Sequence, residues 1–153
     1  MDRIPLPYYR AKHAAEQLVE SGPVPRTTLR ASQFHQLVVG MLAAQRFSPV
    51  LLAPDIRLQP VDTRQVADRL AALAVSAPAG RVADLAGPEV RELPDLARAW
   101  RASTGSRGPV VPVRLPGRTF AAYRAGHQLA PDLRSGGRTF EEFLAATAVR
   151  SGG

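Results

Sequence analysis

The sequence predicts an α/β protein with a doubly wound, mostly parallel sheet. Short apolar or β-branched runs alternate along the chain with amphipathic helical stretches, which is the order found in parallel sheets with helices on their faces. The composition is that of a globular chain, since 45% of the 153 residues are hydrophobic and 22% are charged. No long linker or internal repeat divides the chain, so we expect one structural unit over residues 1–150.

The first helix is expected from Tyr8 to Glu20, because Pro7 suits the first helical position and Gly22 and Pro23 end the pattern. Its apolar stripe includes Tyr8, Leu18 and Val19. A strand is predicted over Val24–Arg30, and then a helix whose N-cap is Ser32. Further strands are predicted over Val50–Ala53, Ile56–Val61, Arg81–Ala86 and Val110–Leu115, and further helices over Asp62–Val75, Leu93–Ala102, Gly117–Gln128 and Thr139–Val149. Leu96, Trp100 and Phe120 are expected in the core.

The net charge of +7 raises the question of nucleic-acid binding. The arginines are spread from Arg3 to Arg150 without a cluster, and aromatic residues make up only 6% of the chain, which is little for base stacking. We therefore expect no nucleic-acid partner. There is no apolar run long enough for a bilayer, no apolar segment in Met1–Pro5, no cysteine and no metal-ligand spacing. These features predict a cytoplasmic protein without membrane contact or metal.

The stretch Pro7–Lys12 carries the clearest chemical signal. Lys12 is the only lysine among the 20 basic residues, and it follows Tyr8 by one helical turn, so that both lie on one face. A phenol is a weak acid at neutral pH, and a neighbouring cation stabilises its phenolate. Such a pair can exchange a proton with a carbonyl or an alcohol. The alternative is a tyrosine that covers the core beside an ordinary surface lysine.

Four further motifs follow this helix in order: TTLRASQFH over 27–35, LQPVDTRQVA over 58–67, DLAGPE over 84–89 and TFEEF over 139–143. Together with YYRAK over 8–12, this order resembles the short-chain dehydrogenase/reductase superfamily, and within it the atypical or extended NmrA-like NAD(P)-binding branch. The resemblance covers the chain from Pro7 to about Ala146. It implies a Rossmann-like fold and NAD or NADP as the cofactor.

The resemblance also implies roles for individual residues. Tyr8 is the expected proton donor or acceptor, and Lys12 is its electrostatic partner and the anchor of the cofactor ribose. Arg30, Ala31, Ser32 and Phe34 are expected beside the cofactor, and Phe34 and His35 in a pocket for a small organic substrate. For Phe34 the alternative is a place in the core, and for His35 it is an ordinary buried or exposed histidine.

The chain departs from the family at the phosphate site. None of its twelve glycines forms the glycine-rich turn, after a strand and before a helix, that binds the pyrophosphate. The family's catalytic serine would also fall before Met1. We therefore expect the C-terminal part of such a protein, with its substrate-side elements but without the N-terminal half of the fold.

Three hypotheses follow for function. The first is a hydride-transferring NAD(P)-dependent oxidoreductase, of which this chain taken alone is inactive. The second is a non-catalytic NAD(P)-sensing regulator, which needs Lys12 but not Tyr8. The third is a truncated interaction module without a cofactor, with self-association through exposed sheet surface.

Overall fold

The structure is a computed structural model, and it describes residues 7–130 and 136–151. Helices and strands alternate, as predicted, and the strands pair in three short ladders. Two of the ladders are parallel: β1 (Thr27–Thr28) pairs with β4 (Gly80–Arg81), and β2 (Leu51–Pro54) with β6 (Val110–Val113). The third, between β3 (Arg57–Leu58) and β5 (Arg91–Glu92), is antiparallel. The predicted α/β class with mostly parallel strands is therefore confirmed.

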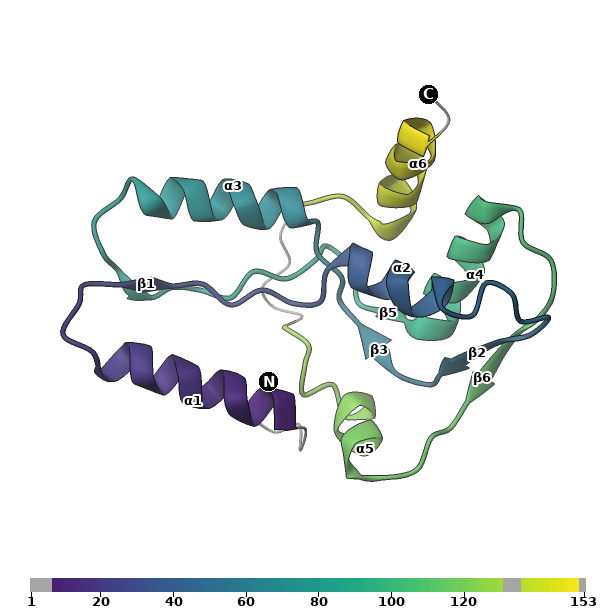
Figure 1. Ribbon diagram of the computed structural model, residues 1–153, viewed down its shortest axis with the longest axis horizontal. Coiled ribbons are helices and arrows are strands. Elements are labelled where there is room, and N and C mark those ends of the chain that lie inside the picture. Colours follow the sequence, from purple (N-terminus) through teal and green to yellow (C-terminus); the bar gives the residue numbers. More distant parts are fainter. Residues whose placement is uncertain (1–6, 131–135, 152–153) are drawn as a thin grey trace.

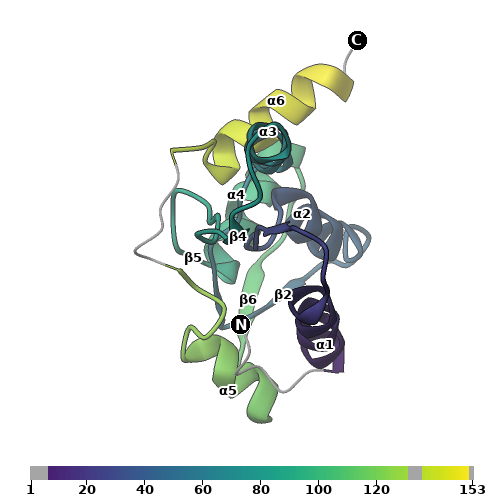
Figure 2. The same cartoon turned by 90° about the vertical axis from the view of Figure 1, so that its left-hand side faces the viewer.

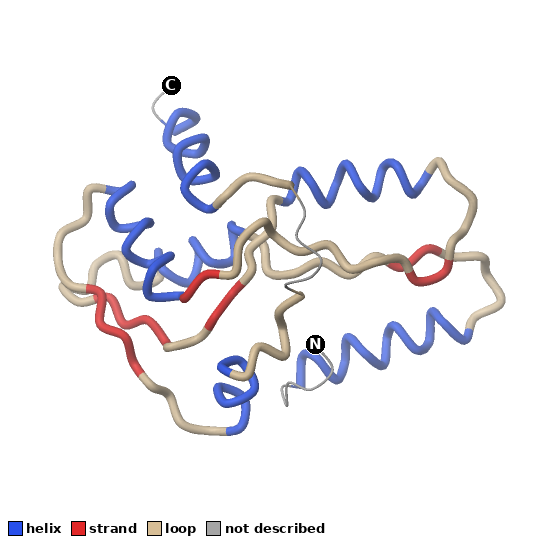
Figure 3. Tube along the Cα trace, turned by 180° about the vertical axis from the view of Figure 1, so that it is seen from behind, coloured by secondary structure: helices blue, strands red, loops and turns tan. Residues whose placement is uncertain are grey.

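Helices lie on both sides of the first ladder. In Figure 1, β1 runs between helix α1 (Pro7–Ser21) and helix α3 (Thr63–Ala74), and the turned view of Figure 2 agrees. Beyond the two-residue strands the chains stay extended and paired, since Ala31 bridges to Leu85 and Phe34 to Val61, both in parallel. These extended segments appear as long tan stretches beside the short red strands in Figure 3. The layers are thus helix, sheet and helix, as in doubly wound proteins.

The apolar core lies at the other end of the molecule. Helices α2 (His35–Ala43), α4 (Leu93–Thr104) and α6 (Phe140–Ser151) pack there with β2 and β6. Leu96 and Trp100 of α4 are buried and Phe120 of α5 (Arg118–Arg124) is partly buried against the cluster, as predicted. A proline in the first turn of α4 and Gly105 with a φ of 64° after its last turn account for where this helix begins and ends.

Helix α3 begins where the sequence places it. The Asp62 carboxylate accepts a hydrogen bond of 2.9 Å from the backbone N–H of Arg64, which satisfies one of the unpaired donors of the first turn. The predicted Ser32 cap is wrong: the residue before α2 is Phe34, and the Ser32 hydroxyl donates instead to the carbonyl of Gln59, at 2.6 Å. The Ser32 side chain therefore links the segment after β1 to the segment after β3.

Most strand predictions are correct in place but too long, whereas the one over Val50–Ala53 matches β2 in length. The predicted strand Val24–Arg30 is reduced to Thr27–Thr28, and Arg81–Ala86 to a ladder of Gly80–Arg81 followed by isolated bridges at Leu85 and Ala86. Strand β5 was not predicted, because Arg91 and Glu92 show neither apolar alternation nor β-branching. The helix predicted over Gly117–Gln128 is regular only over Arg118–Arg124.

Helix α1 forms as predicted, but its apolar stripe does not enter the core. Tyr8 is 66% exposed, Leu18 75% and Val19 54%. The amphipathic pattern was therefore correct for a helix and wrong for its burial among the described residues. None of the helices in the described part of the chain combines the length and apolar character needed to cross a bilayer.

Candidate functional site

A cleft of about 300 Å³ lies where α1 faces the carboxyl end of the extended segment 27–34, which contains β1 and is called the β1 segment below. Helix α1 contributes Tyr8 and Lys12, and the segment after β1 contributes Ala31, Ser32, Gln33 and Phe34. In a sheet of parallel strands this is the carboxyl end, where ligands bind in open α/β folds. Leu29, Leu37 and Val66 complete the lining. The volume lies at the lower end of the range for small-molecule sites.

Tyr8 and Lys12 reach this cleft because of their helical spacing. They are one turn apart in the first half of α1, and both side chains are exposed. Helix α1 and β1 are joined by a short connection, which brings the start of the helix back beside the end of the β1 segment (Figure 1). The structure thus brings together Tyr8, Lys12, Ala31, Ser32 and Phe34, which the sequence placed in one site.

The Ala31–Phe34 segment is held mainly by its backbone. The N–H of Ser32 donates to the carbonyl of Leu85 at 2.9 Å, and the carbonyl of Gln33 accepts from Val61 at 2.8 Å. With its hydroxyl bound to Gln59, Ser32 is 7% exposed and lines the cleft. The wall opposite α1 is therefore fixed by hydrogen bonds to two other segments of the chain.

Gln33 is the polar cleft residue that sequence reasoning missed. Its Oε1 atom is buried and has no hydrogen-bond partner in the described part of the chain. A buried acceptor without a donor is unfavourable by roughly 1–3 kcal/mol, so a ligand with an N–H group fits this position. An amide side chain between two predicted cofactor residues was the signal that could have identified it.

Arg30, a predicted cofactor residue, does not line the cleft. Its side chain is 8% exposed and points to Glu16 of α1, whose carboxylate accepts from Nε at 2.8 and 3.0 Å and also from Nη2. The guanidinium is thus held by a protein carboxylate beside the cleft.

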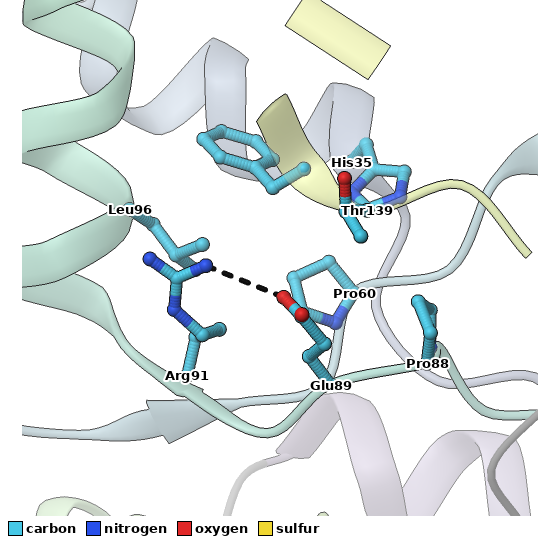
Figure 4. A pocket seen from close by; sticks show the side chains of 8 residues that line it. His35, Pro60, Pro88, Glu89, Arg91, Leu96 and Thr139 are labelled. Atoms are coloured by element: carbon cyan, nitrogen blue, oxygen red, sulfur yellow. Dashed lines mark hydrogen bonds and ion pairs between the residues drawn. The ribbon is translucent and has the colours of Figure 1, made fainter. Parts of the chain in front are cut away.

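His35, a predicted pocket residue, also lies away from Tyr8 and Lys12. It is 1% exposed, its ring stacks on Phe143 with centroids 5.0 Å apart, and Nε2 lies 3.1 Å from the carbonyl of Arg138. Figure 4 shows it beside Pro60 and Thr139 at a second, small cavity, across which Arg91 and Glu89 form an ion pair of 3.3 Å. Burial lowers the pKa of His35, against smaller opposing effects of the Arg138 carbonyl and of Asp62. His35 therefore belongs to the packing of α6 and not to the cleft.

The cleft can be tested against the cofactor that the fold implies. The Lys12 ammonium is a donor suited to ribose hydroxyls, and the unpartnered Gln33 Oε1 suits the carboxamide N–H₂ of a nicotinamide. Residues for a pyrophosphate are not found in the described part of the chain, since no glycine-rich turn there joins a strand to a helix. The described residues thus fit the nicotinamide and ribose end of a dinucleotide.

No family model matches the chain. No curated protein matches it either. Solved structures do. The NADPH-dependent quinone oxidoreductase of Escherichia coli, in complex with NADPH, has a TM-score of 0.74 at 16% identity, over 95% of this chain and 62% of that one. A nucleoside-diphosphate-sugar epimerase of Staphylococcus aureus has a TM-score of 0.65 at 14% identity, over 90% and 57%. An NAD-dependent NDP-hexosamine 5,6-dehydratase of tunicamycin biosynthesis has a TM-score of 0.64 at 18% identity, over 95% and 53%.

These identities establish the fold and nothing finer. The chain spans between about half and two thirds of the length of each of these proteins. Both the helix–sheet–helix layers and the parallel bridges agree with this correspondence. The chain has a partial Rossmann-like α/β fold.

Proposed function

We propose that this chain supplies the proton-transfer and ribose-binding side of an NAD(P)-dependent oxidoreductase of the NmrA-like type. The observation that carries the proposal is the cleft in which Tyr8 and Lys12 face the Ala31–Phe34 segment. Two elements that are separate in sequence meet there at the carboxyl end of a parallel sheet. The substrate is a small organic carbonyl or alcohol, or a quinone.

When bound, the nicotinamide of such a cofactor supplies or accepts a hydride. The chain's own residues bind, orient and move a proton. Lys12 donates to the ribose hydroxyls and stabilises negative charge on the Tyr8 oxygen. Tyr8 gives a proton to the substrate oxygen during reduction, or takes it during oxidation. Gln33 accepts from the carboxamide, which fixes the ring orientation, and Phe34 covers the apolar side.

A titration of the ¹⁵N-labelled chain with NADPH tests this proposal. Because the described residues present one end of the dinucleotide site, we expect weak binding with a Kd near the millimolar range. Amide shifts should be confined to the residues around Tyr8, Lys12 and Ala31–Phe34.

Lys12→Met should abolish these shifts, because it removes the ammonium and keeps the side-chain length. Arg10→Met is the matched control: it removes a positive charge from an exposed position of the same helix that does not line the cleft. Equal losses in both variants, or the absence of cleft shifts with several millimolar NADPH, would contradict the proposal.

A second candidate is an interaction module without a cofactor, and the free edge of β1 favours it. The carbonyl groups of Arg26, Thr28 and Arg30 accept hydrogen bonds from N–H groups within residues 80–85, and the N–H of Ser32 donates to the carbonyl of Leu85. Neighbouring backbone groups point to the opposite edge, where no strand pairs with β1 among the described residues. The exposed Leu18 and Val19 of α1 add apolar surface.

Light scattering after gel filtration separates the two candidates. The interaction module predicts a mass well above 16.4 kDa, together with no response to NADPH. A monomer that unfolds cooperatively and responds to NADPH at the cleft contradicts the module and supports the oxidoreductase site.

A further inference from the structure

The ion pair between Glu16 and Arg30 joins the two walls of the cleft. Arg30 directly precedes the Ala31–Phe34 segment, and Glu16 lies on α1. The Glu16 carboxylate accepts from Arg30 Nε at 2.8 and 3.0 Å and from Nη2 as well. The two side chains are 15% and 8% exposed, respectively. This is therefore a shielded and multiply hydrogen-bonded pair, unlike the exposed pairs that contribute little to stability.

The rest of α1 is largely exposed among the residues whose burial is described. Glu16 is the only residue of this helix that is not exposed, among those whose burial is described. The apolar side chains Leu18 and Val19 are directed to solvent. Packing of these exposed side chains does not hold the helix in place, and the shielded Glu16–Arg30 pair is a contact that ties the middle of α1 to the sheet.

Glu16 is also in register with the cleft residues. Tyr8, Lys12 and Glu16 follow one another at intervals of four, and side chains at this spacing lie on the same side of a helix. Fixing Glu16 against Arg30 therefore fixes both the rotation of α1 and its distance from the sheet. Geometry in a reactive site must hold within about 0.5 Å.

We infer that Glu16 and Arg30 are positioning residues, which hold Tyr8 and Lys12 in place over the Ala31–Phe34 segment. Their consequence for cofactor binding rests on the proposed function. Their effect on the geometry of the cleft does not, so the two can be tested separately.

Hydrogen exchange of the chain without cofactor is the first test. Glu16→Gln keeps the size of the side chain and removes its negative charge, so the Arg30 guanidinium loses its charged partner. We expect the amides of α1 to exchange about ten to a hundred times faster, while amides of α4, which packs in the distant core, keep their rates. Glu20→Gln, one turn further along the same helix and exposed, should leave α1 unchanged.

A distance between α1 and α2 is a quantity that would not change if the ion pair only stabilised the fold. The chain has no cysteine, so spin labels react only with cysteines that are introduced. Ala14→Cys on α1 and Met41→Cys on α2 provide two such positions, and both are exposed. Glu16→Gln should broaden the distance distribution. Arg30→Lys, which keeps the charge but loses the planar fork, should give an intermediate width. Distributions and α1 exchange rates identical to those of the parent chain in both variants would overturn the inference.

NADPH titration then separates the two proposals. If both hold, Glu16→Gln weakens the shifts at Lys12 while the core remains folded. If the parent chain shows no cleft shifts, the proposed function fails, but faster α1 exchange and a broader distance distribution still support the positioning role.

Discussion

Acid should destabilise this protein through one buried histidine. His35 is 1% exposed, stacks on Phe143 and lies against the Arg138 carbonyl. Burial, the largest effect, lowers its pKa below the usual 6.5. The nearby charges that act on it are Asp62 and Glu141, which favour the protonated form, and Arg138, which opposes it.

The sign of the effect follows from proton linkage. Well above pH 6.5 the ring is neutral in both the folded and the unfolded chain, so it causes no change. Below pH 6.5 the unfolded chain takes up a proton before the folded chain does. The free energy of unfolding then falls by up to about 1.4 kcal/mol per pH unit, until the folded-state pKa is reached.

Urea unfolding at pH 7.5, 6.5, 6.0 and 5.5 measures this slope. His35→Asn should be less stable at neutral pH, because it loses the ring contacts, but should show a shallower decline towards acid than the parent chain. Gln17→Asn, at an exposed position of α1, should keep the parent slope. The reasoning is refuted if His35→Asn declines as steeply as the parent.

Two further predictions concern the cleft and the backbone. The first is measured as NADPH oxidation with 1,4-benzoquinone, in a preparation of the protein that catalyses this reaction. Tyr8→Phe should lower kcat at least about a hundredfold and leave NADPH affinity nearly unchanged. An unchanged kcat would favour the NAD(P)-sensing regulator. Gly87→Ala should destabilise the fold by more than about 2 kcal/mol, because the added Cβ would lie 1.7 Å from the Pro60 carbonyl oxygen. Its control, Gly40→Ala in α2, meets no atom within 4 Å and should be neutral or stabilising by up to about 1 kcal/mol; equal effects of the two in thermal unfolding would contradict the packing at Pro60.

The sequence was informative where structure is determined locally. Asp62 caps its helix, Pro7 begins α1, and Trp100 is buried on the predicted face of α4. These features depend on a few neighbouring residues and on helical periodicity. The partial fold and the meeting of Tyr8 and Lys12 with Ala31, Ser32 and Phe34 were expected from the resemblance that the order of the motifs carries.

What the sequence did not predict depends on long-range contacts. Ser32 resembles an N-cap, but its hydroxyl binds Gln59, which is distant in sequence. Arg30 and His35 flank the cleft segment, yet Glu16 draws one side chain to α1 and the aromatic rings of α6 hold the other. The exposed apolar stripe of α1 shows the same limit, since periodicity identifies a face but not what covers it.

The most direct test of the site is to locate the nicotinamide ring on the chain. Transferred nuclear Overhauser effects in a mixture of NADPH and the labelled chain report which side chains lie within a few ångströms of the ring protons. The account predicts contacts from the ring to Tyr8 and Phe34, which disappear in Lys12→Met. Contacts to residues outside the cleft, such as those of the cavity beside His35, would contradict it, as would contacts that persist unchanged in Lys12→Met.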